Sequence, residues 1–191
     1  MTGELTNALE GILERRTGRS IYRLFSEDLA APIGLQDWNA EPDAYASLIR
    51  NDTGLSDHPA HHLTLSTRDM ARLGHLMLRR GAWNGRQVIP ETWVARTTEL
   101  VTPAAEVART SPFIPGLGYG YLWWIFDPVQ ARDTSLDGAY TASGAFGQYI
   151  TVIPKLDTVI AHKTVAPSQR NVTNERYFGT ILNAAISAAT R

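Results

Sequence analysis

The amino-acid sequence predicts an α+β fold in which helices come first and an antiparallel sheet follows. Residues 1–118 carry apolar residues at the three- and four-residue spacing of amphipathic helices, separated by two long irregular stretches. Residues 119–191 carry short aromatic and β-branched runs between turn signals, and then one last helical pattern. Helices followed by a run of strands are typical of α+β proteins. We therefore expect a single domain over 1–191, with a helical part and a sheet part.

The composition excludes several classes of function. The 191 residues include 18 basic and 19 acidic side chains, which gives a formal net charge of −1. A nucleic-acid-binding surface needs a basic excess, so no nucleic-acid partner is expected. No apolar run approaches the ~18 residues of a membrane span, so no membrane association is expected. The absence of cysteine excludes thiolate nucleophiles, iron–sulfur clusters and cysteine-type zinc sites.

Two helices are expected near the start of the chain. The first has its apolar stripe between residues 5 and 13, and Gly18 lies just beyond its end. The second begins after Ser20, which is a favourable N-cap. Proline disfavours helical geometry in the residue before it, so this helix is expected to end at Pro32.

Two more helices follow in the first part. Ser66 is a favourable N-cap and Asp69 stands three residues later, close to the pattern of a capping box. The helix that they open is expected to end before Gly81, and Pro90 opens the next helix. The two irregular stretches, which are expected to be functional or to lie over a cleft, are 33–65 and 100–118.

The second part is expected to form an antiparallel meander and a closing helix. The predicted strands are 119–126, 139–143, 148–153 and 158–163. Residues 154–157 have the sequence PKLD and are expected to form a hairpin turn. The closing helix is expected over about 171–189.

Four segments in this order resemble one protein family. They are STRDMARLG at 66–74, GAWNGRQVIPETWV at 81–94, GYGYLWW at 118–124, and GAFGQYI at 144–150 with Pro154 and Asp157 after it. They resemble segments of the serine β-lactamase-like hydrolases, which include class C-type β-lactamases, penicillin-binding-protein relatives, esterases and 6-aminohexanoate-dimer hydrolases. The sequence DAY at 43–45 and the pair Gly147-Gln148 look most like the last subgroup. The resemblance covers nearly the whole chain and implies the β-lactamase/transpeptidase-like fold, an antiparallel sheet flanked by helices.

The resemblance implies hydrolysis of a small-molecule amide or ester through an acyl-serine, without a cofactor. The family activates its serine with the lysine of a Ser-x-x-Lys motif and relays the proton through a Tyr-x-Asn motif. The sequence has only two lysines, Lys155 and Lys163, and the residues three before them are Val152 and Ile160. No tyrosine is followed two residues later by asparagine. Arginine cannot serve as the base, because its pKa is above ~12.

In the family, both missing motifs lie upstream of the segment that matches residues 5–18. We therefore expect this chain to be the C-terminal portion of a longer enzyme, a partial β-lactamase-like domain, and to be catalytically silent by itself.

A third family segment, a Lys/His-Thr-Gly-like strand, borders the active site and supplies a backbone N–H to the oxyanion. Counting back from Gly147 places this segment near residue 140, with Ala139 in the position of the lysine or histidine. Ala142 is the expected N–H donor. The alanine at 139 argues against β-lactamase-like binding of a substrate carboxylate and favours an esterase or amide hydrolase. The candidate residues of this active-site wall are Tyr140, Thr141, Ala142, Ser143 and Gly144.

Three other interpretations remain open. The chain could be a non-catalytic binding module, and loss of upstream strands would leave a sheet edge through which it could self-associate. Ser143 could be a nucleophile, but the flanking glycines of a nucleophile elbow are missing. The histidines at 58, 61 and 62 with Asp57 could bind a metal, but they match no metal-binding motif and are expected to be a solvated loop.

Overall fold

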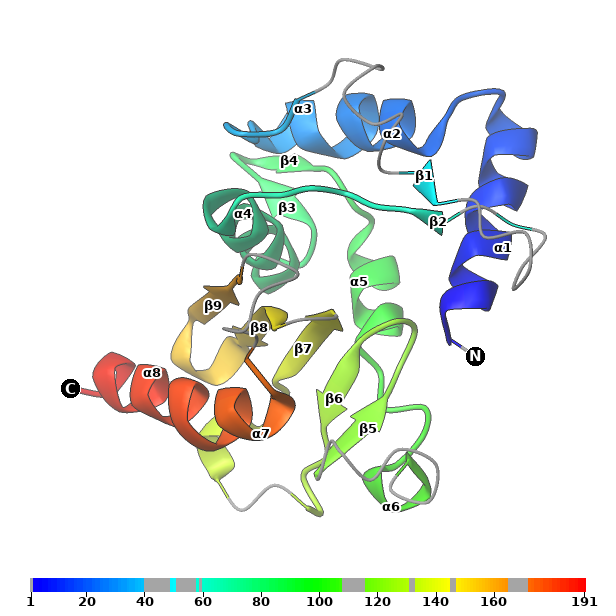
Figure 1. Cartoon of the computed structure of the whole chain (residues 1–191). Helices are drawn as coiled ribbons and strands as arrows, with labels where there is room; N and C mark the ends of the chain where they lie inside the picture. Colours follow the sequence, from blue (N-terminus) through cyan, green and yellow to red (C-terminus); the bar gives the residue numbers. More distant parts are fainter. Residues whose placement is uncertain are drawn as a thin grey trace. The chain divides into compact units, whose positions relative to one another are not determined.

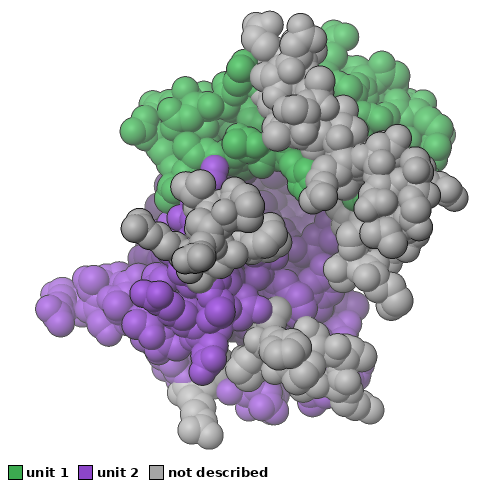
Figure 2. Space-filling view, in the orientation of Figure 1, with its two compact units in different colours: residues 1–69 green, residues 70–191 purple. Residues whose placement is uncertain are grey.

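The computed structural model describes residues 2–39, 49–50, 58, 60–107, 116–130, 133–144, 147–164 and 172–191. The chain divides into two compact units, Met1–Asp69 (unit 1) and Met70–Arg191 (unit 2), which are coloured separately in Figure 2. Helices dominate the first part and an antiparallel sheet the second (Figure 1), which confirms the predicted α+β class. No helix within the described ranges is long and apolar enough to cross a bilayer.

Unit 1 consists of helices and one short strand pair. Its helical elements are α1 (Thr2–Thr17), α2 (Ile21–Leu24), a π-helical segment (Phe25–Ala30) and α3 (Ala31–Ile33). Strand β1 (Ile49–Arg50) pairs antiparallel with β2 (Ala60–His61). The predicted Ser20 cap is confirmed, because its side chain accepts a hydrogen bond from the N–H of Arg23.

The second predicted helix does not end at Pro32. It continues to Ile33 and ends at Gly34, whose φ of 63° is the left-handed conformation of a helix C-cap. The π-helical segment explains how Pro32 is tolerated. In it, the N–H of Ala31 donates to the carbonyl of Ser26, five residues back, so the turn preceding the proline ring is wider than an α-helical turn.

Unit 2 contains a five-stranded antiparallel sheet and the helices around it. Its strands in spatial and chain order are β5 (Leu117–Tyr119), β6 (Trp124–Phe126), β7 (Tyr140–Gly144), β8 (Gln148–Ile153) and β9 (Thr158–His162). The helices are α4 (Thr67–Leu78), which starts in unit 1, α5 (Glu91–Thr97), α6 (Ala104–Val107), α7 (Asn174–Arg176), a π-helical segment (Tyr177–Ile181) and α8 (Leu182–Ala189). A hairpin of β3 (Ala82–Trp83) and β4 (Arg86–Gln87) follows α4.

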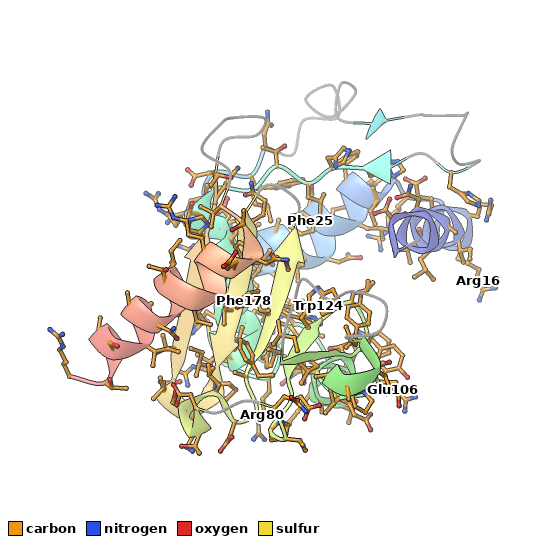
Figure 3. All side chains as sticks on the ribbon, turned by 60° about the horizontal axis from the view of Figure 1, so that its bottom comes forward. Arg16, Phe25, Arg80, Glu106, Trp124 and Phe178 are labelled. Carbon is orange, nitrogen blue, oxygen red and sulfur yellow. The ribbon has the colours of Figure 1, made fainter. Side chains whose placement is uncertain are left out.

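Helices cover both faces of this sheet. On one face, Met77 of α4 and Val94 of α5 pack against Ile125, Tyr140 and Val152 of the strands. The other face packs against the C-terminal helix in a second cluster, whose buried members are Leu117, Phe126, Leu136, Ala139, Tyr149, Ile153, Tyr177, Leu182 and Ile186. Phe178, labelled in Figure 3, joins this cluster and meets Phe126 edge-on, with 6.2 Å between the ring centroids. The sheet is therefore the middle of three layers.

The sheet differs from the prediction at its first strand. The run 119–126 is not one strand but the end of β5, a turn, and β6. Within the turn the N–H of Gly120 donates to the carbonyl of Trp123, and Leu122 adopts a φ of 67°. A β-carbon at Gly120 would stand 2.6 Å from the carbonyl oxygen of Glu99, so only glycine fits there. Composition alone did not reveal this turn, because its other residues are strand formers.

Candidate functional site

The predicted active-site wall is strand β7, which lies in the centre of the sheet but is only partly paired on one side. All five of its residues pair with β8, from Tyr140 opposite Val152 to Gly144 opposite Gln148. On the other side, β6 pairs only with Tyr140 and Thr141. The second half of β7, from Ala142 to Gly144, therefore extends past the end of β6 and has an open edge among the described residues.

The hydrogen-bond pattern identifies which backbone groups face the open edge. The N–H of Phe126 donates to the carbonyl of Ala139 at 3.0 Å, so residue 139 faces β6. Backbone direction alternates along an antiparallel strand, so the odd-numbered residues of β7 face β6 and the even-numbered residues face β8. Ser143 is odd-numbered and therefore faces the β6 side. If the β6–β7 register is extended by two residues, Leu122 stands opposite Ser143, but Leu122 lies in the turn before β6 and not in the strand. The N–H and C=O of Ser143 thus point out of the sheet edge.

The strand register shows which way the N–H of Ala142, the expected oxyanion donor, points. Ala142 faces β8, where it pairs with Ile150, so its N–H is used inside the sheet. The outward N–H belongs to Ser143, one residue later. Ala139 is also fully buried in the cluster under the C-terminal helix, so its side chain cannot contact a substrate.

Side chains of β7 alternate between the two faces of the sheet. Tyr140 packs under α4 and α5, with its ring edge-on to Trp123 at 5.2 Å between centroids. Thr141 lies on the opposite face and is fully buried. Its hydroxyl is 2.9 Å from that of Thr151, which is 2.8 Å from the phenol oxygen of Tyr177. These three hydroxyls satisfy one another in an otherwise apolar layer, which fixes the strand against the C-terminal helix.

The Ser143 side chain follows Thr141 onto the same face of the sheet, and its hydroxyl interacts with the phenol of Tyr149. Tyr149, directly opposite on β8, donates from its phenol to Asn174 Oδ1 at 2.6 Å. Burial raises the pKa of Tyr149, and a hydrogen bond with the Ser143 hydroxyl opposes that rise. A neutral phenol cannot take a proton from a serine hydroxyl, so this geometry gives no support to Ser143 as a nucleophile.

Burial also raises the pKa of Tyr177 to about 12, an effect that its hydrogen bond to Thr151 partly opposes. Tyr177 is fully buried and stacks on Tyr149 with 3.8 Å between ring centroids. A raised pKa means that folding favours the neutral phenol. The resulting stability is complete below the unfolded value of about 10 and is lost as the pH rises through 12.

We therefore expect the free energy of unfolding to fall by about 2–3 kcal/mol between pH 9 and 12, beyond the change shown by a Tyr177→Phe variant. Urea unfolding at a series of pH values measures this difference. Tyr121→Phe is the matched control, because Tyr121 is 43% exposed and the same hydroxyl is removed. Equal pH slopes for the wild type and the Tyr177 variant would contradict the assignment.

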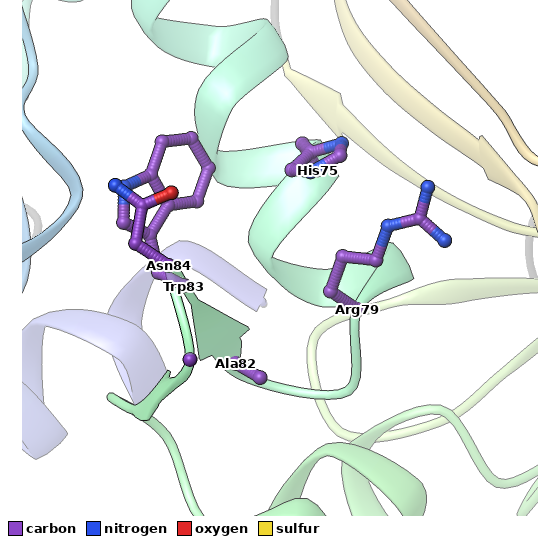
Figure 4. A pocket seen from close by; sticks show the side chains of 6 residues that line it. His75, Arg79, Ala82, Trp83 and Asn84 are labelled. Carbon is purple, nitrogen blue, oxygen red and sulfur yellow. The ribbon is translucent and has the colours of Figure 1, made fainter.

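A surface pocket of about 300 Å³ lies elsewhere in unit 2, between α4 and the β3–β4 hairpin (Figure 4). His75 packs edge-on against Trp83 there, with 5.4 Å between the ring centroids. Arg79 makes an ion pair with Asp157 on the rim, at 2.9 Å. None of the residues that line this pocket belongs to β7, so it is not part of the candidate site.

The described histidines of unit 1 do not form a metal centre. His61 Nδ1 is 2.9 Å from Glu10 Oε2, and its ring meets Tyr22 edge-on. No group of three or more metal-ligating side chains occurs in the part of the chain that the structure describes. Asp57 lies outside that part, as do the DAY sequence at 43–45 and most of the predicted loops, namely 40–48, 51–57 and 108–115.

Comparison with known proteins identifies the fold and the family. The chain superposes on a Bacillus anthracis protein named provisionally as a 6-aminohexanoate-dimer hydrolase, with a TM-score of 0.66, 23% identity, and coverage of 96% of this chain and 42% of that one. It also superposes on EstCE1, a hydrolase with promiscuous acyltransferase activity (TM-score 0.61, 16% identity, 92% and 53% coverage), and on a penicillin-binding-protein homologue from Caulobacter crescentus (TM-score 0.53, 16% identity, 80% and 48% coverage).

The chain thus spans about half the length of these structures or less. Identities below 25% establish a shared fold. The family follows from the sequence, because residues 5–175 match the model of the family described as Beta-lactamase. That match covers most of the chain and agrees with the resemblance of the four motif segments. The chain belongs to the beta-lactamase family of serine hydrolases.

Proposed function

We propose that this chain forms one wall of an acyl-serine hydrolase site, and that the open edge of β7 is the part that contacts the substrate. The reaction would be hydrolysis of a small amide or ester, with the nucleophilic serine and its base supplied by a segment outside this sequence. The single observation that carries the proposal is the outward-facing N–H and C=O of Ser143 at the free half of a central strand.

An open strand edge suits this chemistry for two reasons. Its N–H can donate to the oxyanion that develops when a carbonyl is attacked, and because the sheet fixes that N–H in place, no reorganisation is needed during the reaction. Its C=O can accept a hydrogen bond from an amide N–H of the same substrate. Ser143 offers both groups from one residue, so a substrate amide can be aligned along the edge as an added strand would be.

The lack of a basic side chain on β7, Tyr140–Gly144, favours neutral substrates. Ala139 carries no charge and is buried, so this position cannot bind a substrate carboxylate as the lysine or histidine of the family would. Lys155 is held at the far hairpin, where its ammonium donates to the carbonyl of Thr134 at 2.7 Å and to Asp137 at 3.2 Å. This supports an esterase or amide hydrolase rather than an enzyme that reads a carboxylate.

Amide hydrogen exchange tests the assignment of the edge. The N–H of Ser143 should exchange at least ~100-fold faster than that of Ala142, because only the latter is paired inside the sheet. A small secondary amide added in excess should then shift the NMR signal of the Ser143 amide and leave that of Ala142 unchanged. Slow exchange at Ser143 in the free chain would refute the open edge.

Assays with chromogenic ester and β-lactam substrates test whether the nucleophile and its base lie outside this chain. The chain alone should give no turnover above the buffer rate, while a competent class C-type β-lactamase assayed in parallel does. Turnover that co-purifies with the chain and survives Ser143→Ala would show that a complete nucleophile and base lie within these residues. Turnover abolished by Ser143→Ala would make Ser143 the nucleophile. Either result would overturn the proposal.

A further inference from the structure

Another pocket of unit 2, with a volume of about 380 Å³, lies between α4, α5 and the start of β7. Its walls include the apolar side chains of Met77 and Leu78 from α4 and of Val94 and Ala95 from α5, and Tyr140 of β7. We call it the α4–α5 pocket. Small-molecule sites are concave and mostly apolar, have volumes of roughly 300–1,000 Å³, and contain a few polar groups that orient the ligand. The α4–α5 pocket has the size and the lining of a small site of this kind.

The polar group of this pocket that lacks a partner is the hydroxyl of Tyr140. Only 5% of this residue is exposed, and no residue in the described part of the chain forms a hydrogen bond with its hydroxyl. Burial raises the pKa of the Tyr140 phenol, and no hydrogen bond opposes the rise as it does for Tyr177. Among the described residues, the enclosed side-chain atom without a partner is Ser135 Oγ, so the Tyr140 oxygen is not sealed inside the core.

We infer that the α4–α5 pocket binds a small neutral molecule with an apolar body and a carbonyl oxygen, and that the Tyr140 hydroxyl donates a hydrogen bond to this oxygen. Ketones, esters and amides of small size belong to this class. A buried hydroxyl without a partner is costly in free energy, and an acceptor on the ligand would remove that cost. The raised pKa keeps the phenol protonated at neutral pH, so it is available as a donor.

The other polar groups of the pocket favour a neutral ligand. Arg80 and Glu91 form an ion pair, with 3.0 Å between Nη1 and Oε1, so neither charge is left over for an ionic ligand. The Thr98 hydroxyl donates to the carbonyl of Val94 at 3.0 Å and is also engaged. A charged ligand would lose its hydration in the apolar pocket without gaining a partner of opposite charge.

This site is separate from the open edge of β7. Tyr140 is paired on both sides, with Ile125 of β6 and Val152 of β8, whereas the open half of the strand begins at Ala142. The Tyr140 side chain lies on the face covered by α4 and α5, and that of Ser143 lies on the opposite face. The inference therefore does not rest on the proposed hydrolase function.

Tyr140→Phe and two ligands of matched shape test the hydrogen bond. Acetophenone carries a carbonyl on a benzene ring, and α-methylstyrene has a methylene group in place of the oxygen. The substitution should weaken acetophenone binding about 3- to 10-fold, which is the contribution of one hydrogen bond, and leave α-methylstyrene binding unchanged. Titrations followed by the NMR signals of the backbone amides measure both affinities. Benzoate, which has a charge, should bind at least ~10-fold more weakly than acetophenone.

The stability of the free chain tests whether the hydroxyl lacks a partner before a ligand binds. Tyr140→Phe should leave the equilibrium constant of unfolding unchanged or lower it, because no hydrogen bond is lost. Tyr177→Phe is the matched control, since Tyr177 is also buried but its hydroxyl is 2.8 Å from that of Thr151. The control should raise the unfolding constant about 5-fold. Equal destabilisation in the two variants would show that the Tyr140 hydroxyl already has a partner.

Ala95→Phe tests the location of the site. Ala95 is an exposed residue of α5 that lines the pocket, so a phenyl ring there should occupy the pocket without entering the core, and acetophenone binding should be lost. Thr92→Phe is the control, because Thr92 is exposed on the same helix but does not line the pocket. This variant should bind acetophenone like the wild type.

Three results would overturn the inference. The first is the absence of acetophenone binding to the wild-type chain, or binding that survives Ala95→Phe. The second is an equal effect of Tyr140→Phe on the two ligands. The third is a set of NMR shifts centred on Ser143 instead of on Ala95, Thr98 and Gly138, which would place the ligand at the open edge of β7 and leave the proposed hydrolase function intact.

Discussion

Replacing Gly74 by alanine should destabilise unit 2 by about 1–3 kcal/mol, although alanine favours helix over glycine by about 1 kcal/mol. Gly74 lies on the side of α4 that faces the sheet. A β-carbon at this position would overlap Val159 Cγ1 of β9 and stand 2.9 Å from Ile150 Cγ2 of β8. Both side chains are β-branched and sit on strands, so they cannot swing aside without leaving their rotamers. Either α4 or the edge of the sheet must move.

Gly179→Ala is the matched control for this prediction. Gly179 lies in the π-helical segment of the C-terminal helix, and no atom lies within 4 Å of a β-carbon built there. The same substitution should therefore be neutral or stabilise the protein slightly through the lower entropy of the unfolded chain. Chemical unfolding of both variants measures the contrast. If the two variants unfold at the same denaturant concentration, α4 is not in close contact with β8 and β9.

The parts of the sheet that could be predicted from the sequence are those in which local pattern and long-range packing agree. Strand β8 has the predicted bounds, Gln148–Ile153. Its side chains point alternately to the two faces of the sheet, and both faces are covered by helices. The turn at 154–157 is confirmed as well. Pro154 opens a short 3₁₀ turn, and Asp157 takes the left-handed conformation, with φ of 48°, that asparagine and aspartate tolerate. The closing helix is also confirmed, with Thr173 as its N-cap and its first helical residue at Asn174.

The parts that could not be predicted depend on contacts between distant segments. The turn at Gly120–Trp123 consists largely of strand formers, and its geometry is fixed by the carbonyls of Thr97 and Glu99, well before it in the chain. The π-helical segment around Ser26 allows a proline to be accommodated in the helix. None of its residue types indicates a π-helical turn. Local propensity is a weak guide wherever tertiary packing overrides it.

The candidate site illustrates both situations. The sequence predicted a strand at 139–143, and β7 runs over Tyr140–Gly144, so the strand that carries the candidate wall was located to within one residue. The sequence could not decide which N–H is free, since that depends on where β6 ends and on which residues of β7 face it. A shift of one residue reverses the backbone direction in a strand. The group that we propose to contact the substrate, the amide of Ser143, therefore follows from strand register and not from residue type.

Asp69 is the second position where we expect a large effect, and its structural role also differs from the one its sequence pattern suggests. In a capping box, the Asp69 carboxylate would reach back to the N–H of Ser66. Half of the motif is present, because the N–H of Asp69 donates to Ser66 Oγ at 3.1 Å. The carboxylate instead accepts hydrogen bonds from the N–H groups of Gln36 at 2.8 Å and Asp37 at 3.0 Å. Asp69 is fully buried, so it ties the segment after α3 to the start of α4.

Asp69→Ala should destabilise unit 1 by about 3–5 kcal/mol, because it removes two hydrogen bonds to a charged acceptor and leaves two backbone N–H donors without that partner. Asp69→Asn should fall between this variant and the wild type, since its amide group offers one acceptor oxygen but turns N–H donors toward the second backbone N–H. Chemical unfolding gives the overall loss. Amide exchange locates it, and the N–H groups of Gln36 and Asp37 should lose their protection first.

Asp37→Asn is the control that separates hydrogen bonding from charge. Asp37 is exposed, and its backbone N–H is the group that contacts Asp69, so the substitution removes one negative charge from the same neighbourhood without removing the carboxylate acceptor. It should change the free energy of unfolding by less than about 0.5 kcal/mol. If Asp69→Asn and Asp37→Asn had the same small effect, the buried carboxylate would be dispensable, and the segment after α3 would be held by the packing of its apolar side chains alone.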